Sequence, residues 1–137
     1  MFASAAARAR FVDHSLDTAS PSRLLTLLYD RLLLDVARAE RALRDGNRQG
    51  AHTLLLHAQD IVSALRDGLD TSWDGAARLD SIYTFLLTEL VSANVDGDAD
   101  RAAACLELIA PLRDTWHEAA VVAGAGAATA AFVGQSA

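Results

Sequence analysis

The chain has 137 residues, of which 52% are hydrophobic, 6% aromatic and 22% charged, and its formal net charge is −6 at pH 7. This length supports one domain with a substantial core. The acidic balance and the dispersed arginines argue against a nucleic-acid partner, because binding a phosphate backbone requires a basic patch. Two prolines and eight glycines leave few turns, which favours long helices over many short strands.

The ends of the chain and its cysteine content bear on the cellular location of the protein. Cys105 is the only cysteine, and because one thiol cannot form an internal disulfide, a reducing cytosolic compartment is favoured. The N-terminal stretch MFASAAARARFV has two arginines but no apolar run after them, so we expect no cleaved signal peptide. Residues 121–137 are rich in Ala and Gly, and we expect a mobile tail there and no membrane insertion.

The first predicted helix runs from Pro21 to about Arg44. Ser20 can cap its free N–H groups, Pro21 suits the first helical position, and the stretch DGN at residues 45–47 ends it. Its apolar seam has the helical spacing of three or four and consists of Leu25, Leu28, Leu32, Val36, Ala39 and Leu43. A second apolar line lies beside this seam and consists of Leu24, Leu27 and Leu34. The helix therefore carries more apolar surface than one seam needs.

The next two predicted helices show the same excess. One runs from about Arg48 to Leu69, and its seam consists of Leu54, Ala58, Ile61, Leu65 and Leu69, widened by Leu55 and Val62. The stretch DTSWDG breaks the chain at residues 70–75. The following helix runs from about Gly75 to Ala93, and its seam consists of Leu79, Ile82, Tyr83, Leu86, Leu90 and Ala93. Its residues beyond one face are Phe85, Leu87 and Val91.

A fourth helix is predicted after Asp98 or Asp100, either of which can be its N-cap. Its stripe includes Leu106, Ile109, Leu112 or Arg113, Trp116, and Ala119 or Ala120. Pro111 lies inside it, and because an interior proline removes a backbone hydrogen bond, we expect a kink or break near Leu108. Short loops between long helices place neighbours antiparallel.

The expected architecture is therefore an all-α, antiparallel up-down four-helix bundle. Residues 1–17 would form a flexible N-terminal cap segment, residues 18–120 the bundle, and residues 121–137 a flexible tail.

Metal binding is not supported by the residue spacing. The four histidines are scattered and are expected on the solvated surface: His14, His52, His57 and His117. No Glu-x-x-His pair of the kind used in di-iron bundles occurs in the sequence. A partial calcium-loop spacing is formed by Asp96, Asp98, Asp100 and Glu107. Arg101 stands where such a loop requires glycine, so helix capping explains these acids better.

Catalysis is also unsupported. Cys105 lies in an alanine-rich helical stretch with no neighbouring base and is expected to be a small core residue. The sequence has no glycine-rich phosphate loop. We therefore predict no catalytic residues, no cofactor and no enzymatic activity.

The apolar excess on the first three helices has two readings. It can fill a wide core, or it can form a groove that binds an amphipathic helix of a partner. Large exposed apolar patches on monomers usually mark binding sites. Periodicity alone leaves both readings open.

Four stretches, in order and spacing, resemble a known family. Residues 18–33, TASPSRLLTLLYDRLL, are similar to the opening of the flagellin-specific export chaperones of bacterial flagella, the FliS family. Residues 57–70 (HAQDIVSALRDGLD) and 75–94 (GAARLDSIYTFLLTELVSAN) resemble the second and third helices of that family. Residues 111–119, PLRDTWHEA, resemble its closing motif. Together the stretches span most of residues 11–120.

The resemblance implies a cytosolic helical chaperone that uses neither nucleotide nor metal. Such a protein binds the disordered C-terminal segment of flagellin in apolar grooves, blocks premature polymerisation and presents flagellin to the flagellar type III export gate. The alternative is a helical adaptor that uses the same groove for another secretion substrate or regulator.

The resemblance also implies site residues. Phe11 and Leu16 would form a movable N-terminal cap over part of the binding surface, although the family usually has tyrosine where this chain has Phe11. The candidate groove residues are Leu27, Tyr29, Leu55, Val62, Ile82, Leu86, Leu87 and Leu90. Because sequence does not fix the rotation of each helix about its axis, some of these residues must belong to the core instead.

Overall fold

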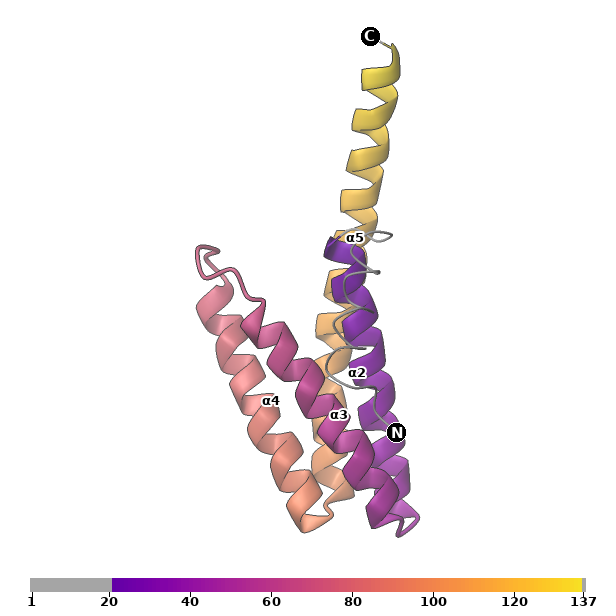
Figure 1. The fold of residues 1–137 in the computed structure, drawn as a ribbon, viewed down its shortest axis with the longest axis vertical. Helices are drawn as coiled ribbons and strands as arrows, with labels where there is room; N and C mark the ends of the chain where they lie inside the picture. The colour runs from indigo at the N-terminus through magenta and orange to yellow at the C-terminus, as the bar shows by residue number, and fades with distance from the viewer. Residues whose placement is uncertain (1–20, 137) are drawn as a thin grey trace, which may run out of the picture. The chain divides into compact units, whose positions relative to one another are not determined.

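The computed structural model describes the backbone of residues 21–136 and the side chains of residues 21–122. Its helices are α2 (Pro21–Arg44), α3 (Arg48–Asp67), α4 (Ala76–Asp96) and α5 (Ala99–Ser136) (Figure 1). No strand occurs within the described backbone. The all-α prediction is confirmed, and the predicted helix starts and breaks agree to within a few residues. The predicted cap residues Ser20, Phe11 and Leu16 lie outside the described residues.

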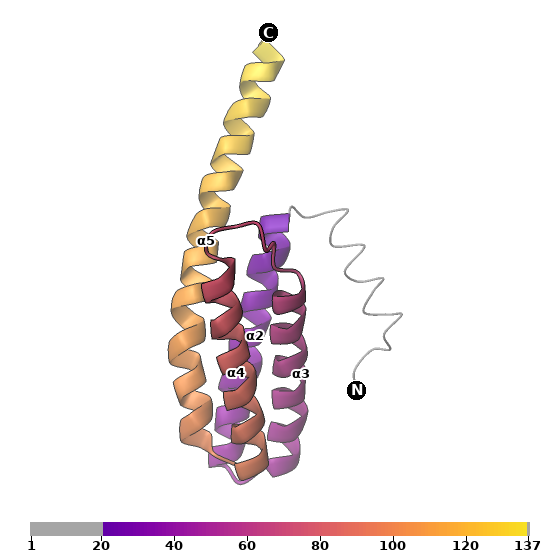
Figure 2. The ribbon, with the colours of Figure 1, turned by 90° about the vertical axis from the view of Figure 1, so that its left-hand side faces the viewer.

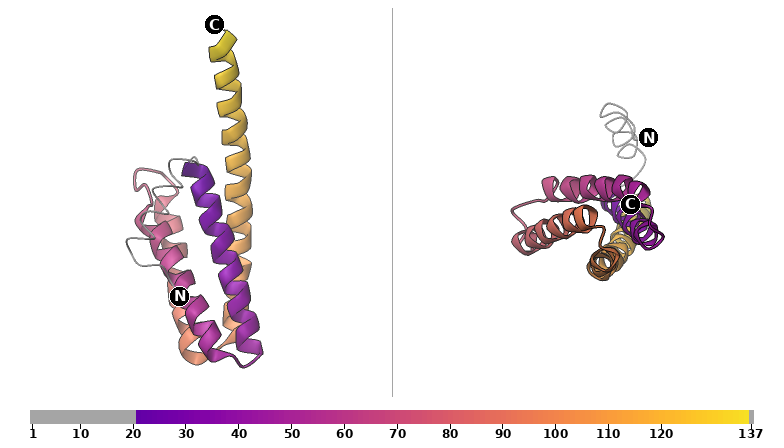
Figure 3. Two further views of the ribbon diagram at one scale, coloured as in Figure 1. Left: turned by 45° about the vertical axis from the view of Figure 1, so that its right-hand side comes forward. Right: turned by 90° about the horizontal axis from the view of Figure 1, so that it is seen from below.

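The chain divides into two compact units, and the first of them is the bundle unit, residues 28–113. The second unit consists of residues 1–27 and 114–137. Within the bundle unit, α3 and α4 run side by side (Figure 2). The α2 and α5 helices also lie alongside each other (Figure 3), and ion pairs join Asp30 to Arg113 and Arg44 to Asp100. These pairs require opposite chain directions, which confirms the antiparallel arrangement.

The helix ends follow local capping signals. The Asn47 side chain accepts a hydrogen bond from the Gly50 N–H at 2.9 Å and so caps α3. Gly97 ends α4 with a left-handed φ of 63°, a conformation that suits glycine. The Asp98 side chain then accepts from the Arg101 N–H at 3.1 Å. Of the two predicted N-caps of the fourth helix, Asp98 is therefore the one that makes the capping bond.

The core of the bundle unit is aliphatic with two tyrosines. Its buried hydrophobic residues within this unit are Tyr29, Leu32, Val36, Ala39, Ala51, Leu55, Ala58, Ile61, Val62, Leu65, Ala76, Leu79, Tyr83, Leu86, Leu90, Ala93, Ala102, Cys105 and Ile109. Burying a leucine, valine or isoleucine side chain contributes about 1.5–3 kcal/mol relative to leaving it in water. Apolar burial therefore stabilises the antiparallel arrangement.

The apolar excess on the helices divides between core and surface. Leu55 and Val62 on α3 are fully buried, so they widen the core. In contrast, Leu34 on α2 is 41% exposed, and Phe85 and Val91 on α4 are 46% and 45% exposed. The apolar excess on α3 therefore widens the core, whereas part of the excess on α2 and α4 is exposed.

The structure differs from the sequence-based expectation at Pro111 and at the tail. A kink or a break was expected near Leu108, and the break is absent because the α5 helix is continuous through Pro111. Pro111 has no N–H to donate to the carbonyl of Glu107. Both residues are exposed, so water can hydrogen-bond to that carbonyl instead. The same helix extends to Ser136, whereas a mobile tail rich in Ala and Gly was expected from residue 121. Alanine has the strongest helix propensity of all residues, which explains this continuation.

The two core tyrosines bond to each other. The hydroxyl oxygens of Tyr29 on α2 and Tyr83 on α4 lie 2.5 Å apart in the buried interior. Burial, followed by the hydrogen bond from Tyr29, raises the pKa of Tyr83 well above its ordinary value. The Tyr83 phenol therefore stays neutral throughout the physiological range.

A buried carboxylate links α2 to α3. Asp35 is fully buried, and its Oδ2 is hydrogen-bonded to Nδ1 of His57. Its Oδ1 lies 3.0 Å from Nε of Arg31, but the geometry of this ion pair does not make a hydrogen bond. His57 was expected on the solvated surface, yet its side chain is only 21% exposed. The expectation was wrong because Asp35, one of the few buried polar residues, provides a partner for the ring.

Tyr83→Phe should destabilise the protein by about 1 kcal/mol, because it removes a buried hydrogen bond while keeping the ring. Urea unfolding followed by circular dichroism measures the change. In a double-mutant cycle with Tyr29→Phe, the two single substitutions should cost more in sum than the double substitution. Strictly additive costs would show that the two hydroxyls do not interact.

The same phenol makes stability depend on alkaline pH. Above about pH 10 the unfolded chain loses the Tyr83 proton, while the folded protein retains it because the pKa is raised. The unfolding free energy should therefore be unaffected by this group below pH 10 and should fall as the pH rises further. In Tyr83→Phe, urea unfolding at several alkaline pH values should show a shallower decline. An unchanged slope would contradict this assignment.

Cys105 is a core thiol that should react slowly. It is 1% exposed, and burial, with a smaller effect from Glu89, raises its pKa to about 11. Since the thiolate is the reactive form, iodoacetamide at neutral pH should modify the folded protein far more slowly than the urea-unfolded chain. Mass spectrometry measures the rate. Equal rates for the folded and unfolded protein would place this thiol outside the core.

Candidate partner-binding surface

Most of the predicted groove residues lie inside the core. Tyr29, Leu55, Val62, Leu86 and Leu90 are all fully buried, so they are not on the surface of this structure. The remaining three candidates have accessible atoms: Leu27 is 42% exposed, and Ile82 and Leu87 are half-buried. The difference arises from helix rotation, because leucines occur on more than one side of α2, α3 and α4.

The most unusual surface is the outward side of α4. We define the α4 face as its six exposed residues between Asp80 and Asp96: Ser81, Thr84, Phe85, Thr88, Val91 and Val95. None of them is charged, and Val95 is 70% exposed. In a chain with 22% charged residues, an uncharged exposed side of this length is a candidate binding surface.

The hydroxyl groups of the α4 face use their hydrogens within the helix. The Ser81 hydroxyl donates to the Ala77 carbonyl at 3.1 Å, and the Thr84 hydroxyl donates to the Asp80 carbonyl at 2.9 Å. The Thr88 hydroxyl likewise donates to the Thr84 carbonyl at 3.1 Å. Because these donors already have partners, covering the face with an apolar group leaves no hydroxyl hydrogen unsatisfied. The face can therefore lose its water at low cost.

Apolar side chains also line the edge between α4 and α5. Nε of Arg101 lies 3.6 Å from Oε2 of Glu89, which shows the antiparallel register of the two helices. Two turns away on each helix, Ile82 and Leu108 therefore face the same edge, and Leu108 is 42% exposed. Phe85 lies between Ile82 and Glu89 on this side of α4. The edge extends the apolar part of the α4 face toward α5.

Polar contacts bound the α4 face on its other edge, toward α3. Nε of Arg66 lies 2.9 Å from Oδ1 of Asp80, and His52 Nδ1 lies 3.0 Å from the Asn94 amide nitrogen. A hollow of about 250 Å³ lies at the end near the Arg66–Asp80 pair. Ligand pockets usually have about 300–1,000 Å³ and enclose their ligand. An extended surface fits a polypeptide partner better than a small molecule.

The described residues also bear on two other kinds of function, metal binding and membrane insertion. Within the described part of the chain, no group of three or more His, Cys, Asp or Glu side chains is placed to hold a metal ion. No helix among those residues combines the length and apolar character needed to cross a lipid bilayer. Asp98, which belongs to the partial calcium-loop spacing, caps α5 as expected.

Sequence reasoning found only part of the α4 face. It singled out Phe85 and Val91 as excess apolar residues but passed over Ser81, Thr84, Thr88 and Val95. A signal for them was present: positions at helical spacing from residue 81 to residue 95 carry no charge. Serine and threonine count as polar residues, so the pattern is easy to miss in the sequence. The hydrogen bonds that their hydroxyl groups make within the helix are visible only in the structure.

Comparisons with known proteins agree on one family. The family model described as "Flagellar protein FliS" matches residues 3–123. The flagellar secretion chaperone FliS of Bacillus subtilis is 26% identical over 109 residues, covering 80% of this chain and 82% of the relative. The flagellar secretion chaperone FliS of Escherichia coli is 27% identical over 113 residues, covering 78% of this chain and 81% of the relative.

A solved structure supports the fold independently. A bacterial flagellar chaperone in a crystal structure superposes with a TM-score of 0.68 at 20% identity, covering 82% of this chain and 94% of the other. The four-helix architecture is thus one already seen in a flagellar chaperone. Since the family model spans most of the sequence, this chain belongs to the FliS family of flagellar proteins.

Proposed function

We propose that this chain is a cytosolic chaperone for flagellin. It binds the disordered C-terminal segment of flagellin, prevents premature polymerisation and delivers the subunit to the flagellar type III export gate. Membership of the FliS family and the names of its relatives, flagellar secretion chaperones, support this role. The observation that carries the proposal at the residue level is the uncharged, exposed α4 face.

The α4 face suits a segment that folds as it binds. Ordering a disordered segment costs several kcal/mol, so the surface must offer apolar contact and few groups that resist desolvation. Phe85, Val91 and Val95 supply the apolar contact. Each buried CH₂ contributes about 0.8 kcal/mol, so a helix with a few leucine-sized side chains against this face can offset its ordering cost.

The α4–α5 edge gives the docked helix a direction. Ile82, Phe85 and Leu108 form an apolar strip along it, which ends at the Glu89–Arg101 pair. Ridges of an incoming helix can lie against this strip. The proposal includes no catalytic step and no cofactor, and the family is one of chaperones.

Thr88→Asp should weaken binding of the flagellin C-terminal segment at least about tenfold, which corresponds to about 1.4 kcal/mol. The aspartate places a charge at the centre of the α4 face, where a docked apolar helix would have to desolvate it. Calorimetry of the chaperone against the C-terminal segment of flagellin from the same organism measures the affinity. The unmodified protein should bind near 1:1 with a negative heat-capacity change.

The matched control is Ala64→Asp, which adds the same charge at an exposed position of α3. This variant should bind like the unmodified protein, and both variants should keep their helical circular dichroism. Failure of the unmodified protein to bind the segment would refute the function. Binding by Thr88→Asp at full strength would show instead that the partner docks away from the α4 face.

A further inference from the structure

The residues of the α4 face are arranged almost symmetrically around Thr88. A helix turns by about 100° per residue, so all six residues lie within about 60° of the direction in which Thr88 points. Ser81 and Val95 are seven positions before and after Thr88, and the others lie three or four positions from it. A two-fold axis at Thr88 would therefore place an identical helix antiparallel against this face, as a symmetric dimer requires.

Large and small side chains would alternate across such a pair of α4 helices. Each residue then meets one that is about equally far beyond Thr88 in the second copy and on the same edge. The three larger apolar residues of the face are each set against a small residue that carries a hydroxyl, and the pairs are Val95 with Ser81, Val91 with Thr84, and Phe85 with Ser92. Two helices with this pattern can approach closely without leaving large voids.

The charges at the two ends of the face also match in this arrangement. Arg78 is one turn before Ile82, and Asp96 is two turns after Glu89, so both lie on the α5 edge of α4. They are ten positions before and eight positions after Thr88, which brings Arg78 of each copy close to Asp96 of the other. Both side chains are exposed, and neither has an ion pair with another described residue. Symmetry forms this opposite-charge contact twice.

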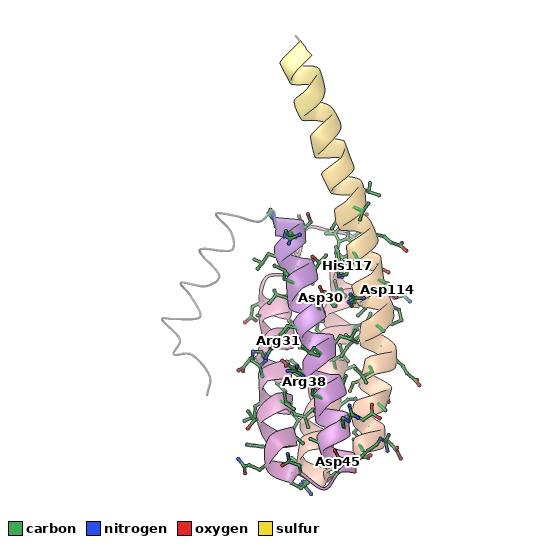
Figure 4. All side chains as sticks on the ribbon, turned by 90° about the vertical axis from the view of Figure 1, so that its right-hand side faces the viewer. Asp30, Arg31, Arg38, Asp45, Asp114 and His117 are labelled. Atoms are coloured by element: carbon green, nitrogen blue, oxygen red, sulfur yellow. The ribbon has the colours of Figure 1, made fainter. Side chains whose placement is uncertain are left out.

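The opposite side of the bundle unit is less suited to a second copy. Figure 2 shows α4 nearest the viewer, whereas the reverse view in Figure 4 shows α2 with the charged residues Asp30, Arg31 and Arg38. The net charge of −6 on each chain opposes association. At physiological ionic strength, however, exposed charges more than about 8 Å apart are largely screened. The uncharged α4 face is where two copies can make contact with least repulsion.

We propose that the α4 face of the free protein is covered by the α4 face of a second copy, in a two-fold dimer with Arg78–Asp96 contacts at both ends. The face extends over about 21 Å of helix, at 1.5 Å per residue. Its dimer therefore belongs with the weak interfaces that bury less than about 1,200 Å². Because cargo uses the same face in the proposed function, self-association and cargo binding should exclude each other.

The test is sedimentation velocity of the full chain without flagellin, from about 10 μM to about 500 μM, a range that suits a weak dimer. The weight-average mass should rise from one chain toward two. Arg78→Glu and Asp96→Arg should each weaken association at least about tenfold, because each places two like-charge contacts in the dimer. An equimolar mixture of these two variants has opposite charges at both contacts and should associate like the unmodified protein.

The controls separate the proposed contact from overall charge. Arg38→Glu changes the net charge as Arg78→Glu does, but on exposed α2, and it should associate like the unmodified protein. Asp96→Arg makes the chain less negative, so overall repulsion alone would strengthen its association instead of weakening it. All variants should retain their helical circular dichroism, since the substituted positions are exposed.

Two results would overturn the inference. One is a protein that stays monomeric at every concentration, which would leave the α4 face free for cargo. The other is a mixture of Arg78→Glu and Asp96→Arg that associates no better than either variant alone, which would place the contact between copies elsewhere. Because flagellin is absent from these measurements, neither result bears on the proposed function. Failure of the flagellin segment to bind in calorimetry would refute that function and leave the dimer standing.

Discussion

The hydrogen bond between the hydroxyls of Tyr29 and Tyr83 constrains the rest of the bundle unit. It lies in the interior, where a buried hydroxyl without a partner would cost about 1–3 kcal/mol. The bond therefore favours the same rotation of α2 and α4 about their axes that the buried apolar residues require. With Tyr83 turned inward, Thr88 lies about 140° around the helix and must face outward. The α4 face is exposed because Tyr83, on the inward side of the same helix, is buried.

Ion pairs and capping bonds further constrain the helices once their rotation is set. Glu89–Arg101 and Asp80–Arg66 hold the two edges of α4 against α5 and α3, and each is exposed enough to contribute only a few tenths of a kcal/mol. Their effect is on register more than on stability. Because Asp80 and Glu89 are paired at these edges, the exposed positions of α4 from Ser81 to Val95 carry no charge.

The helices and their breaks could be predicted because their signals are local. Each of these signals acts within one helical turn: Pro21 starts α2, Asn47 caps α3 and Gly97 ends α4. The candidate binding surface could not be predicted to the same degree, since the residues that are exposed depend on the rotation of each helix about its axis. In the sequence, Leu55 and Phe85 both belong to the apolar residues beyond a single helix face. In the structure, Leu55 is fully buried and Phe85 is 46% exposed. His57 was misplaced for a related reason: its partner Asp35 is 22 residues away in sequence.

An export chaperone has to hold its cargo and then release it, and an uncharged docking surface bears on both demands. In the proposed function, apolar contact with the α4 face would give an affinity that salt hardly changes. The hydroxyl hydrogens of this face are already bonded within the helix, so cargo could cover and leave the face without breaking a hydrogen bond of the bundle. Release would then need no unfolding of the bundle.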